Sequence, residues 1–129
     1  MKSSISFILN LPFTLIGLIL AMIAISYKIK ILKNPIAIVF KVKSFWWTFG
    51  YFKKARAITI GNVIMLSPKE LKNDYKHEII HVRQYERYPF IFPIFYYYEM
   101  VKRGYRMNRF EDEAYIKSKS FYNGVQQGI

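Results

Sequence analysis

The chain has 129 residues, carries 20 lysine and arginine residues against 8 acidic residues, and contains no cysteine. Without cysteine it can hold neither a disulfide framework nor a cysteine-ligated zinc finger, and its length suits one domain with a modest core. Apolar residues make up 53% and aromatic residues 19% of the sequence, which is high for a soluble protein of this size and favours membrane contact.

The first predicted element is a helix from Ile5 to Tyr27, a stretch of 23 residues without a single charge. About 20 apolar residues are enough to cross the hydrocarbon layer of a bilayer, so residues 1–27 are predicted to form a transmembrane helix. The rival interpretation is a secretory signal peptide cleaved near Ala24-Ile25-Ser26, although the apolar core of such a peptide is usually only about 7 to 15 residues long.

The charges after this segment predict its orientation. Eight basic residues and no acidic residue lie between Lys28 and Arg56, whereas only Lys2 and the amino terminus precede the segment. Positive charge is enriched on the cytoplasmic side of membrane proteins. We therefore expect a single-pass protein of the cell membrane whose carboxyl-terminal body lies in the cytoplasm, with the anionic lipid of that leaflet as a partner.

Residues 28–119 are predicted to form one domain that begins with β-structure. Ile36 to Val42 has the composition of a strand, and Ala57 to Leu66 is a second β-rich segment with a turn or bulge at Gly61-Asn62. Between them, the aromatic cluster at 45–52 fits either the headgroup level of a membrane or the core of a hairpin.

A helix is predicted next, and it carries the most informative motif of the chain. Ser67 suits its cap and Pro68 its first turn, a reset at Asp74 is the alternative start, and Pro89 ends it. Within it, His77-Glu78-Ile79-Ile80-His81 places the only two histidines of the chain on one helical face, with Glu78 beside them. Two imidazoles placed in this way can bind one Zn²⁺, and Glu78 can take the proton of a water molecule at the open position.

A catalytic zinc site needs a third protein ligand, and only a carboxylate can supply it here. The acidic residues after the motif are Glu86, Glu99, Glu111, Asp112 and Glu113. Glu86 lies on the same helix, too close to fold back onto the metal, and Glu99 lies in an aromatic run where it can reach solvent. Glu111 opens a new helix after Gly104 and is the favoured ligand, although acidic residues at a helix start also serve as partners of the helix dipole.

The stretch from His77 to Tyr115, HEIIHVRQYERYPFIFPIFYYYEMVKRGYRMNRFEDEAY, resembles a family of small prokaryotic HExxH proteins of the zinc metallopeptidase type. The pattern of that family is HE-x-x-H-V-R-Q-Y, then a proline-containing apolar segment, then G-Y-R-x-N-x-F-E-x-E-A. More distantly, the His-Glu-x-x-His and Glu-x-x-Ala motifs are similar to those of gluzincin peptidases, including the membrane-bound CAAX prenyl proteases. The resemblance extends to Asn10-Leu11-Pro12 and to residues 57–64. It implies His77, His81 and Glu111 as zinc ligands and Glu78 as general base.

Two positions depart from these families. Tyr115 stands where the prenyl-protease branch usually has an aspartate, which puts the usual partner of a ligand histidine in doubt. Arg109 stands where the small family often has proline, a change that we expect to affect only a turn. In gluzincins a strand beside the zinc helix pairs with extended substrate, and the resemblance suggests Val63 to Leu66 for that role.

The predicted fold class is α+β and mostly helical: one transmembrane helix, then a minimal gluzincin-like domain with a short sheet, then a polar tail at 120–129. The predicted function is that of a membrane-anchored zinc endopeptidase acting on peptide or protein substrates. A non-catalytic membrane protein with a structural zinc site is the alternative. A nucleic-acid partner is not expected, because much of the net charge of +12 flanks an apolar segment and no nucleic-acid-binding motif is present. The sequence does not indicate an oligomeric state.

Overall fold

In the computed structural model of the chain, the structure describes residues 2–33, 35–43, 56–68, 70, 73–119, 121–122 and 125–126. The helices and strands, in chain order, are α1 (Lys2–Leu9), α2 (Leu11–Ile23), β1 (Ser26–Lys33), β2 (Ile36–Val42), β3 (Ala57–Ile60), β4 (Val63–Leu66), α3 (Asp74–Arg87), α4 (Phe92–Met107), α5 (Arg109–Ser118), β5 (Phe121–Tyr122) and β6 (Val125–Gln126). The predicted aromatic cluster at 45–52 lies outside the described residues.

The first four strands form one sheet with the order β1-β2-β4-β3. Neighbouring strands are antiparallel except for β2 and β4, which run parallel with Ile38 opposite Val63. The two central strands therefore have a strand on each side, and they are largely apolar because both of their faces are covered. Among the described residues, β1 and β3 are the edges of this sheet.

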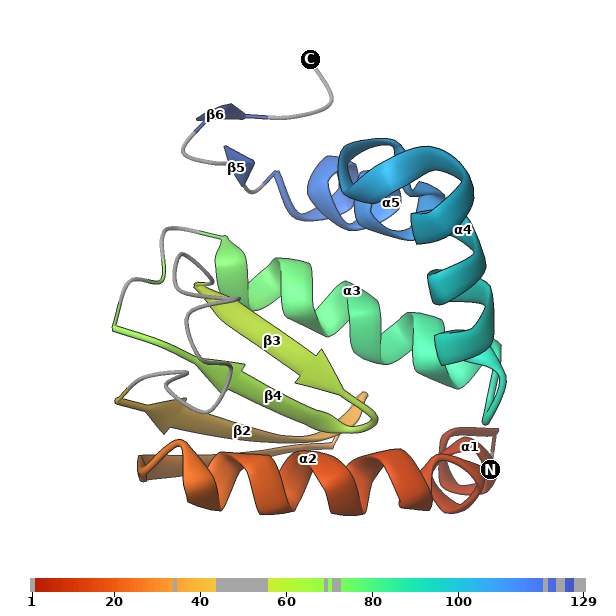
Figure 1. The fold of residues 1–129 in the computed structure, drawn as a ribbon. Helices are drawn as coiled ribbons and strands as arrows, with labels where there is room; N and C mark the ends of the chain where they lie inside the picture. The colour runs from red at the N-terminus through yellow and green to blue at the C-terminus, as the bar shows by residue number, and fades with distance from the viewer. Residues whose placement is uncertain are drawn as a thin grey trace.

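One helix covers each face of the sheet. Figure 1 shows α2 below the strands and α3 above them, with α4 and α5 beyond α3. The buried cluster on the α2 side contains Ala21, Ala24, Phe40, Val42, Val63 and Met65. The buried cluster on the α3 side contains Ala37, Val39, Ile64, Leu66 and Val82. Alternate residues of β2 and β4 thus face α2 and α3 in turn, as the period of two in a strand requires.

The turn between β3 and β4 is fitted closely against α2. Gly61 has a φ of 61°, and a Cβ at this position would lie 2.5 Å from the backbone nitrogen of Thr14, so both its conformation and its surroundings require glycine. The Asn62 backbone N–H donates to Thr14 Oγ1 at 3.1 Å, and Asn62 Nδ2 donates to the Ile36 carbonyl at 2.6 Å. This turn, which Gly61-Asn62 predicts, therefore connects α2, the hairpin and β2.

The predicted transmembrane helix is wrong. Residues 5–27 form most of the 8-residue α1 and all of the 13-residue α2, and then enter β1 at Ser26. Within the part of the chain that the structure describes, no helix has both the length and the apolar composition needed to cross a bilayer. The fold class as predicted, the single-pass topology and the cytoplasmic placement derived from it are corrected accordingly, and the boundary at residue 27 lies inside a strand.

Asn10 gives the physical reason for this break. Its side chain is fully buried between α1 and α2, where Nδ2 donates to the Tyr85 carbonyl at 3.0 Å and Oδ1 accepts from the Phe90 backbone N–H at 2.8 Å. Both partners lie at or just after the carboxyl end of α3. A polar side chain that satisfies buried backbone groups fixes a corner at this point, and average hydropathy does not register it.

A kink and a cap position the last helix. Gly104 interrupts α4 with a φ of 78° and a ψ of 171°, and Asn108 then caps α5 by accepting the Phe110 backbone N–H at 2.9 Å. The Phe110 ring packs on Phe92 with ring centroids 5.0 Å apart. These contacts turn the first residues of α5 back towards α3, where Glu111 is buried.

Candidate metal centre

Three side chains from two helices meet at one point inside the molecule. His77 and His81, one turn apart on α3, bring their Nε2 atoms to within 3.1 Å of each other. Glu111, in the first turn of α5, places Oε1 at 3.0 Å from His77 Nε2 and 3.2 Å from His81 Nε2. The three atoms therefore form a nearly equilateral triangle. We call this the metal triangle.

The size of the metal triangle suits a zinc ion. Ligand atoms of a tetrahedral zinc site, at bond lengths of about 2.0 to 2.1 Å, stand roughly 3.3 to 3.4 Å apart. The observed separations of 3.0 to 3.2 Å are close to that value. Two imidazoles and one carboxylate are also a donor set that zinc accepts with one coordination position left open. His77, His81 and Glu111 are exposed by only 5%, 7% and 4%, so water competes little for these atoms.

The charges around the metal triangle favour a cation within it. Burial by itself lowers the pKa of His81, but the charge and hydrogen bond of Glu111 outweigh it and raise the pKa to about 9. Burial by itself raises the pKa of Glu111, and the two histidines reverse this effect and hold the pKa well below its usual range. A proton satisfies this arrangement without metal, and a divalent cation can replace that proton.

Glu78 lies beside the metal triangle without being part of it. Its Oε1 accepts a hydrogen bond from Thr59 Oγ1 at 2.7 Å, and its Oε2 lies 3.9 Å from His77 Nε2. Thr59 belongs to the edge strand β3, so the sheet holds one oxygen of this carboxylate while the other faces the triangle. A general base can act from this position, and Glu78 also lies close enough to His77 and His81 to hold a metal ion with them.

Gln84 orients one of the ligand histidines. It lies on α3 one turn after His81, is fully buried, and places Oε1 at 2.8 Å from His81 Nδ1. Its Nε2 donates to the Phe110 carbonyl at 2.9 Å and to Glu113 Oε1 at 2.6 Å. Because both of these partners are acceptors, the amide nitrogen must face them and Oε1 must face the histidine. In the neutral form that binds metal, His81 therefore carries its one proton on Nδ1 and directs the lone pair of Nε2 into the triangle.

Tyrosines close the other side of the site. Tyr96 donates its hydroxyl to Glu111 Oε2, the oxygen that does not face the histidines. Tyr115 packs its ring on that of His77 with centroids 4.2 Å apart, and its hydroxyl lies 2.8 Å from that of Tyr105. Burial raises the pKa of Tyr115 to about 12, and burial followed by the charge of Glu111 raises that of Tyr96 as well. Both phenols therefore remain neutral at physiological pH.

The remaining acidic candidates lie outside the metal triangle. Glu113 is bound instead by Gln84, by Arg87 Nη2 at 3.0 Å and by Lys117 Nζ at 2.8 Å. Glu99 is buried and does not extend to solvent as expected, because it pairs with Arg103 Nε at 3.2 Å and accepts from the backbone of Arg109 at 3.3 Å.

The structure brings together the four residues that the motif and the resemblance select, and it adds others that sequence reasoning missed. For Gln84 the position is predicted and only the role is wrong: its spacing places it on the helical stripe of His77 and His81, but the sequence slightly favours a solvated side chain over one that lines the cleft, and the structure buries it. Thr59 and Tyr96 carry no signal in the sequence, because only the tertiary fold brings β3 and α4 to this helix. The suggested substrate strand is also corrected: Val63–Leu66 is a central, fully buried strand, and the edge beside Glu78 is β3.

Comparison of the chain with protein-family models, with curated proteins and with solved structures finds no match. The metallopeptidase resemblance therefore remains a prediction from the motif residues. The function has to be argued from the geometry of the site.

Proposed function

We propose that the chain is a zinc-dependent peptidase. The observation that carries the proposal is the metal triangle of His77, His81 and Glu111, with the Glu78 carboxylate held beside it by Thr59. A purely structural zinc site has no use for a fourth group, an unligated carboxylate, fixed beside its three ligands. A hydrolase uses such a group to move protons.

The chain's own residues supply proton transfer and positioning. Zinc bound by the metal triangle would act as a Lewis acid, polarising a carbonyl and lowering the pKa of a water molecule. Glu78 Oε2 accepts a proton from that water as its oxygen bonds to the carbonyl carbon, and returns the proton to the amine nitrogen as the carbon–nitrogen bond breaks. Thr59 holds Oε1, which keeps Oε2 aimed at the reacting atoms.

The edge strand β3 offers a place for the substrate. Within the described residues it pairs with β4 on one side only, with Ala57 opposite Leu66 and Ile60 opposite Val63. An extended peptide can add to such an edge through backbone hydrogen bonds. Since Thr59 lies in the same strand and contacts Glu78, a peptide bound along β3 would pass close to the metal triangle.

A second candidate function, a structural zinc site without catalysis, is favoured by the burial of the site. His77, Glu78, His81 and Glu111 are each exposed by no more than 7%. Structural zinc sites are closed, whereas catalytic sites keep a position open to water.

One paired experiment separates the two functions. Glu78→Gln keeps the size of the side chain but removes the base, so we expect unchanged zinc content together with a loss of roughly 10²- to 10⁴-fold in cleavage of a denatured protein substrate. Glu86→Gln, the same change on the same helix, is the control and should cleave like the wild type. Zinc binding without cleavage by the wild-type chain, over a broad panel of denatured proteins, would favour the structural site.

A further inference from the structure

A large apolar surface covers the side of the molecule opposite the metal centre. Between Ile5 and Ile31, thirteen large apolar residues are exposed, by 36% to 75%. They come from the outer sides of α1 and α2, from Ile25 between α2 and β1, and from the edge strand β1, and we call this surface the α1–α2 face. Monomeric soluble proteins rarely expose contiguous apolar patches larger than a few hundred square ångströms, so this surface indicates an interaction site.

The packing of α2 explains why these residues point outwards. Thr14, Gly17 and Ala21 form its buried stripe, and a Cβ on Gly17 would lie 2.8 Å from the Ile60 carbonyl oxygen. The small side of the helix therefore lies against the sheet. The larger residues, such as Ile19 and Met22, are left on the outside, exposed by 58% and 75%.

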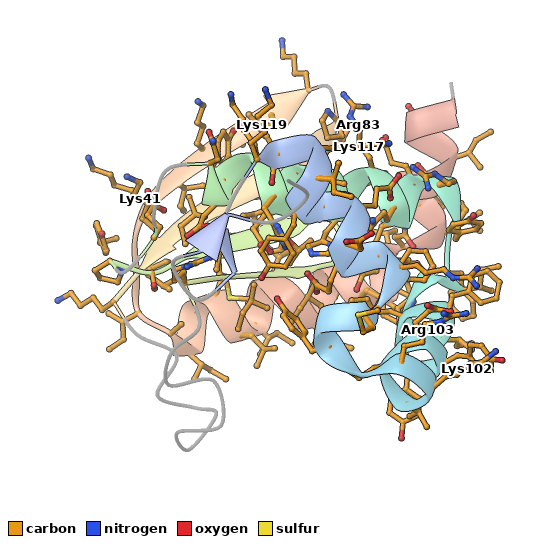
Figure 2. All side chains as sticks on the ribbon, turned by 90° about the horizontal axis from the view of Figure 1, so that it is seen from above. Lys41, Arg83, Lys102, Arg103, Lys117 and Lys119 are labelled. Carbon is orange, nitrogen blue, oxygen red and sulfur yellow. The ribbon has the colours of Figure 1, made fainter. Side chains whose placement is uncertain are left out.

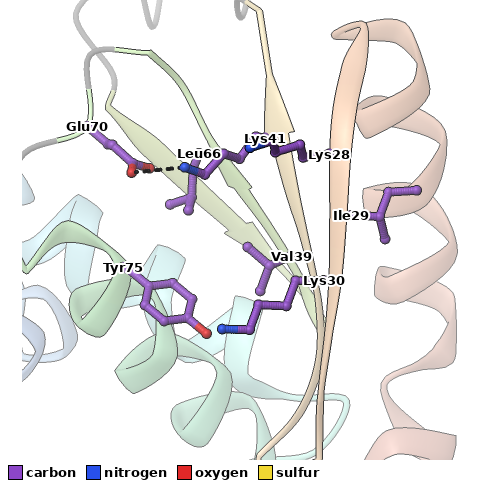
Figure 3. Close-up of a pocket in the computed structure, with 8 residues that line it drawn as sticks. All are labelled: Lys28, Ile29, Lys30, Val39, Lys41, Leu66, Glu70 and Tyr75. Atoms are coloured by element: carbon purple, nitrogen blue, oxygen red, sulfur yellow. Dashed lines mark ion pairs between the residues drawn. The ribbon is translucent and has the colours of Figure 1, made fainter.

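Strand β1 extends the α1–α2 face beyond the helix. Ile29 and Ile31 pair with Phe40 and Ile38, both on the α2 side of the sheet, and are exposed by 64% and 71%. Lys33 pairs with Ile36, two residues before Ile38, and so lies on the same side as an exposed basic residue at the end of the strand. Figure 3 shows Ile29 and Lys30 leaving β1 on opposite sides, with Lys30 directed towards Tyr75.

The charge distribution decides which partner fits this face. The first 69 residues contain ten basic residues and no acidic residue. Residues 5–33, which form this face, include no acidic residue, and Lys33 lies at its edge. A second copy of the chain would offer no acidic group to pair with Lys33, whereas a two-fold interface has to be self-complementary. An anionic lipid surface offers apolar chains for the isoleucines and a phosphate group for Lys33.

We propose that the α1–α2 face docks onto the surface of an anionic lipid bilayer, with α2 lying in the plane of the interface and no part of the described chain crossing it. The face lies on the other side of the sheet from α3, as Figure 1 shows. Docking therefore leaves the metal centre and strand β3 away from the lipid. This inference does not depend on the proposed peptidase activity.

The apolar contribution is tested by vesicle flotation with matched variants. Wild-type protein should float with vesicles of phosphatidylcholine containing about one-third phosphatidylglycerol, and Ile19→Glu should lower the bound fraction at least about tenfold. Ile116→Glu is the control, because Ile116 is 48% exposed on α5, in the layer beyond α3. Both residues are exposed, so circular dichroism should show that both variants fold.

The electrostatic contribution is tested with charge reversals. Lys33→Glu should weaken binding to the anionic vesicles several-fold, with little effect on pure phosphatidylcholine vesicles. Lys102→Glu, on α4, is the control and should bind like the wild type; Figure 2 shows Lys102 beside Arg103, on the helical layer beyond α3. Binding should also fall as salt is raised, because screening weakens attraction between exposed charges.

Three results overturn the proposal. The first is failure of the wild-type chain to float with anionic vesicles. The second is an equal loss of binding in Ile19→Glu and Ile116→Glu, which would show that the face is not involved. The third is a dimer, detected by sedimentation equilibrium, that Ile19→Glu dissociates while vesicle binding is unchanged; the face would then be an interface between two copies. None of these results bears on zinc content or cleavage.

Discussion

The two helices that cover the sheet differ in the kinds of side chain that they bury and expose. α2 buries Thr14 and the small residues Gly17 and Ala21, and exposes large apolar residues. α3 buries His77, Glu78, His81 and Gln84, together with the apolar Val82 and Tyr85. An ordinary surface helix does the reverse, with an apolar stripe inwards and polar residues outwards. Both departures need a compensating partner.

The compensation differs between the two helices. Buried ionisable groups are costly unless hydrogen bonds, opposite charges or a metal satisfy them, and on α3 the carboxylate of Glu111 and the amide of Gln84 do so within the chain. Exposed apolar groups on α2 cost little in the folded chain itself and become important when a partner covers them. Substitutions on the inner side of α3 should therefore affect stability and metal binding, whereas those on the outer side of α2 should affect association.

Removal of zinc should produce the largest change on the α3 side. We expect about one zinc ion per chain, and zinc at a thousand times its Kd would add roughly 4 kcal/mol to the free energy of unfolding. A chelator should lower the Tm of the wild type markedly and that of His81→Ala hardly at all, because that variant has lost a ligand. Metal analysis and calorimetry measure both effects. If the wild-type chain holds no zinc after loading at neutral pH, then metal does not stabilise the buried ionisable groups of α3.

Glu111→Ala should weaken zinc binding more than Glu113→Ala does. Glu111 contributes an oxygen to the metal triangle, whereas Glu113 reaches the site only through the Gln84 amide. Loss of such an outer partner typically costs about 10- to 100-fold in metal affinity, and loss of a ligand should cost more. Competition with a chromogenic chelator gives both affinities. A larger effect of Glu113 would place the third ligand two residues further along α5.

Much of the candidate site could be predicted from the sequence because it depends on local geometry. Histidines four residues apart share a face of any helix, and an acidic residue after a glycine break, such as Glu111 after Gly104, falls at the start of the next helix. The turn at Gly61-Asn62 is equally local. In contrast, the hydrogen bond from Thr59 to Glu78 depends on how the sheet packs on α3, and no spacing in the sequence encodes it.

The first 33 residues show where hydropathy misleads. An uncharged segment of 23 residues is long enough for a membrane span. The mean hydropathy of the segment hardly changes with one polar residue, so it does not reveal that the hydrogen bonds of Asn10 turn the chain. The segment 27–33, Tyr-Lys-Ile-Lys-Ile-Leu-Lys, alternates apolar and basic residues over most of its length as a strand does. The same lysines also fit the flank of a membrane helix, and for this reason the sequence does not predict β1.

Asn10→Leu tests the corner between α1 and α2 directly. The change removes the hydrogen bonds to the Tyr85 carbonyl and the Phe90 N–H, and it leaves the Tyr85 carbonyl buried without its side-chain partner. The expected cost is about 1 to 3 kcal/mol for the buried Tyr85 carbonyl left without a partner, measured by urea denaturation. Leu9→Asn is a suitable control, because Leu9 is 46% exposed and its replacement should have little effect. A stability of Asn10→Leu equal to the wild type would mean that other contacts determine the corner.

Met22→Gln should have the smallest effect on the free energy of unfolding. It is informative when it is compared with Met65→Gln, the same change at a buried position. Met22 is 75% exposed on the outer side of α2, whereas Met65, fully buried in β4, belongs to the cluster that α2 covers. An exposed substitution away from special contacts changes stability by less than about 0.5 kcal/mol. The same change at Met65 buries an amide without arranged partners and should cost about 2 kcal/mol or more. Urea denaturation of the purified variants, without lipid, gives both values. If Met22→Gln destabilises the chain as much as Met65→Gln, the outer side of α2 is already covered in solution, and the contrast drawn between the two helices does not hold.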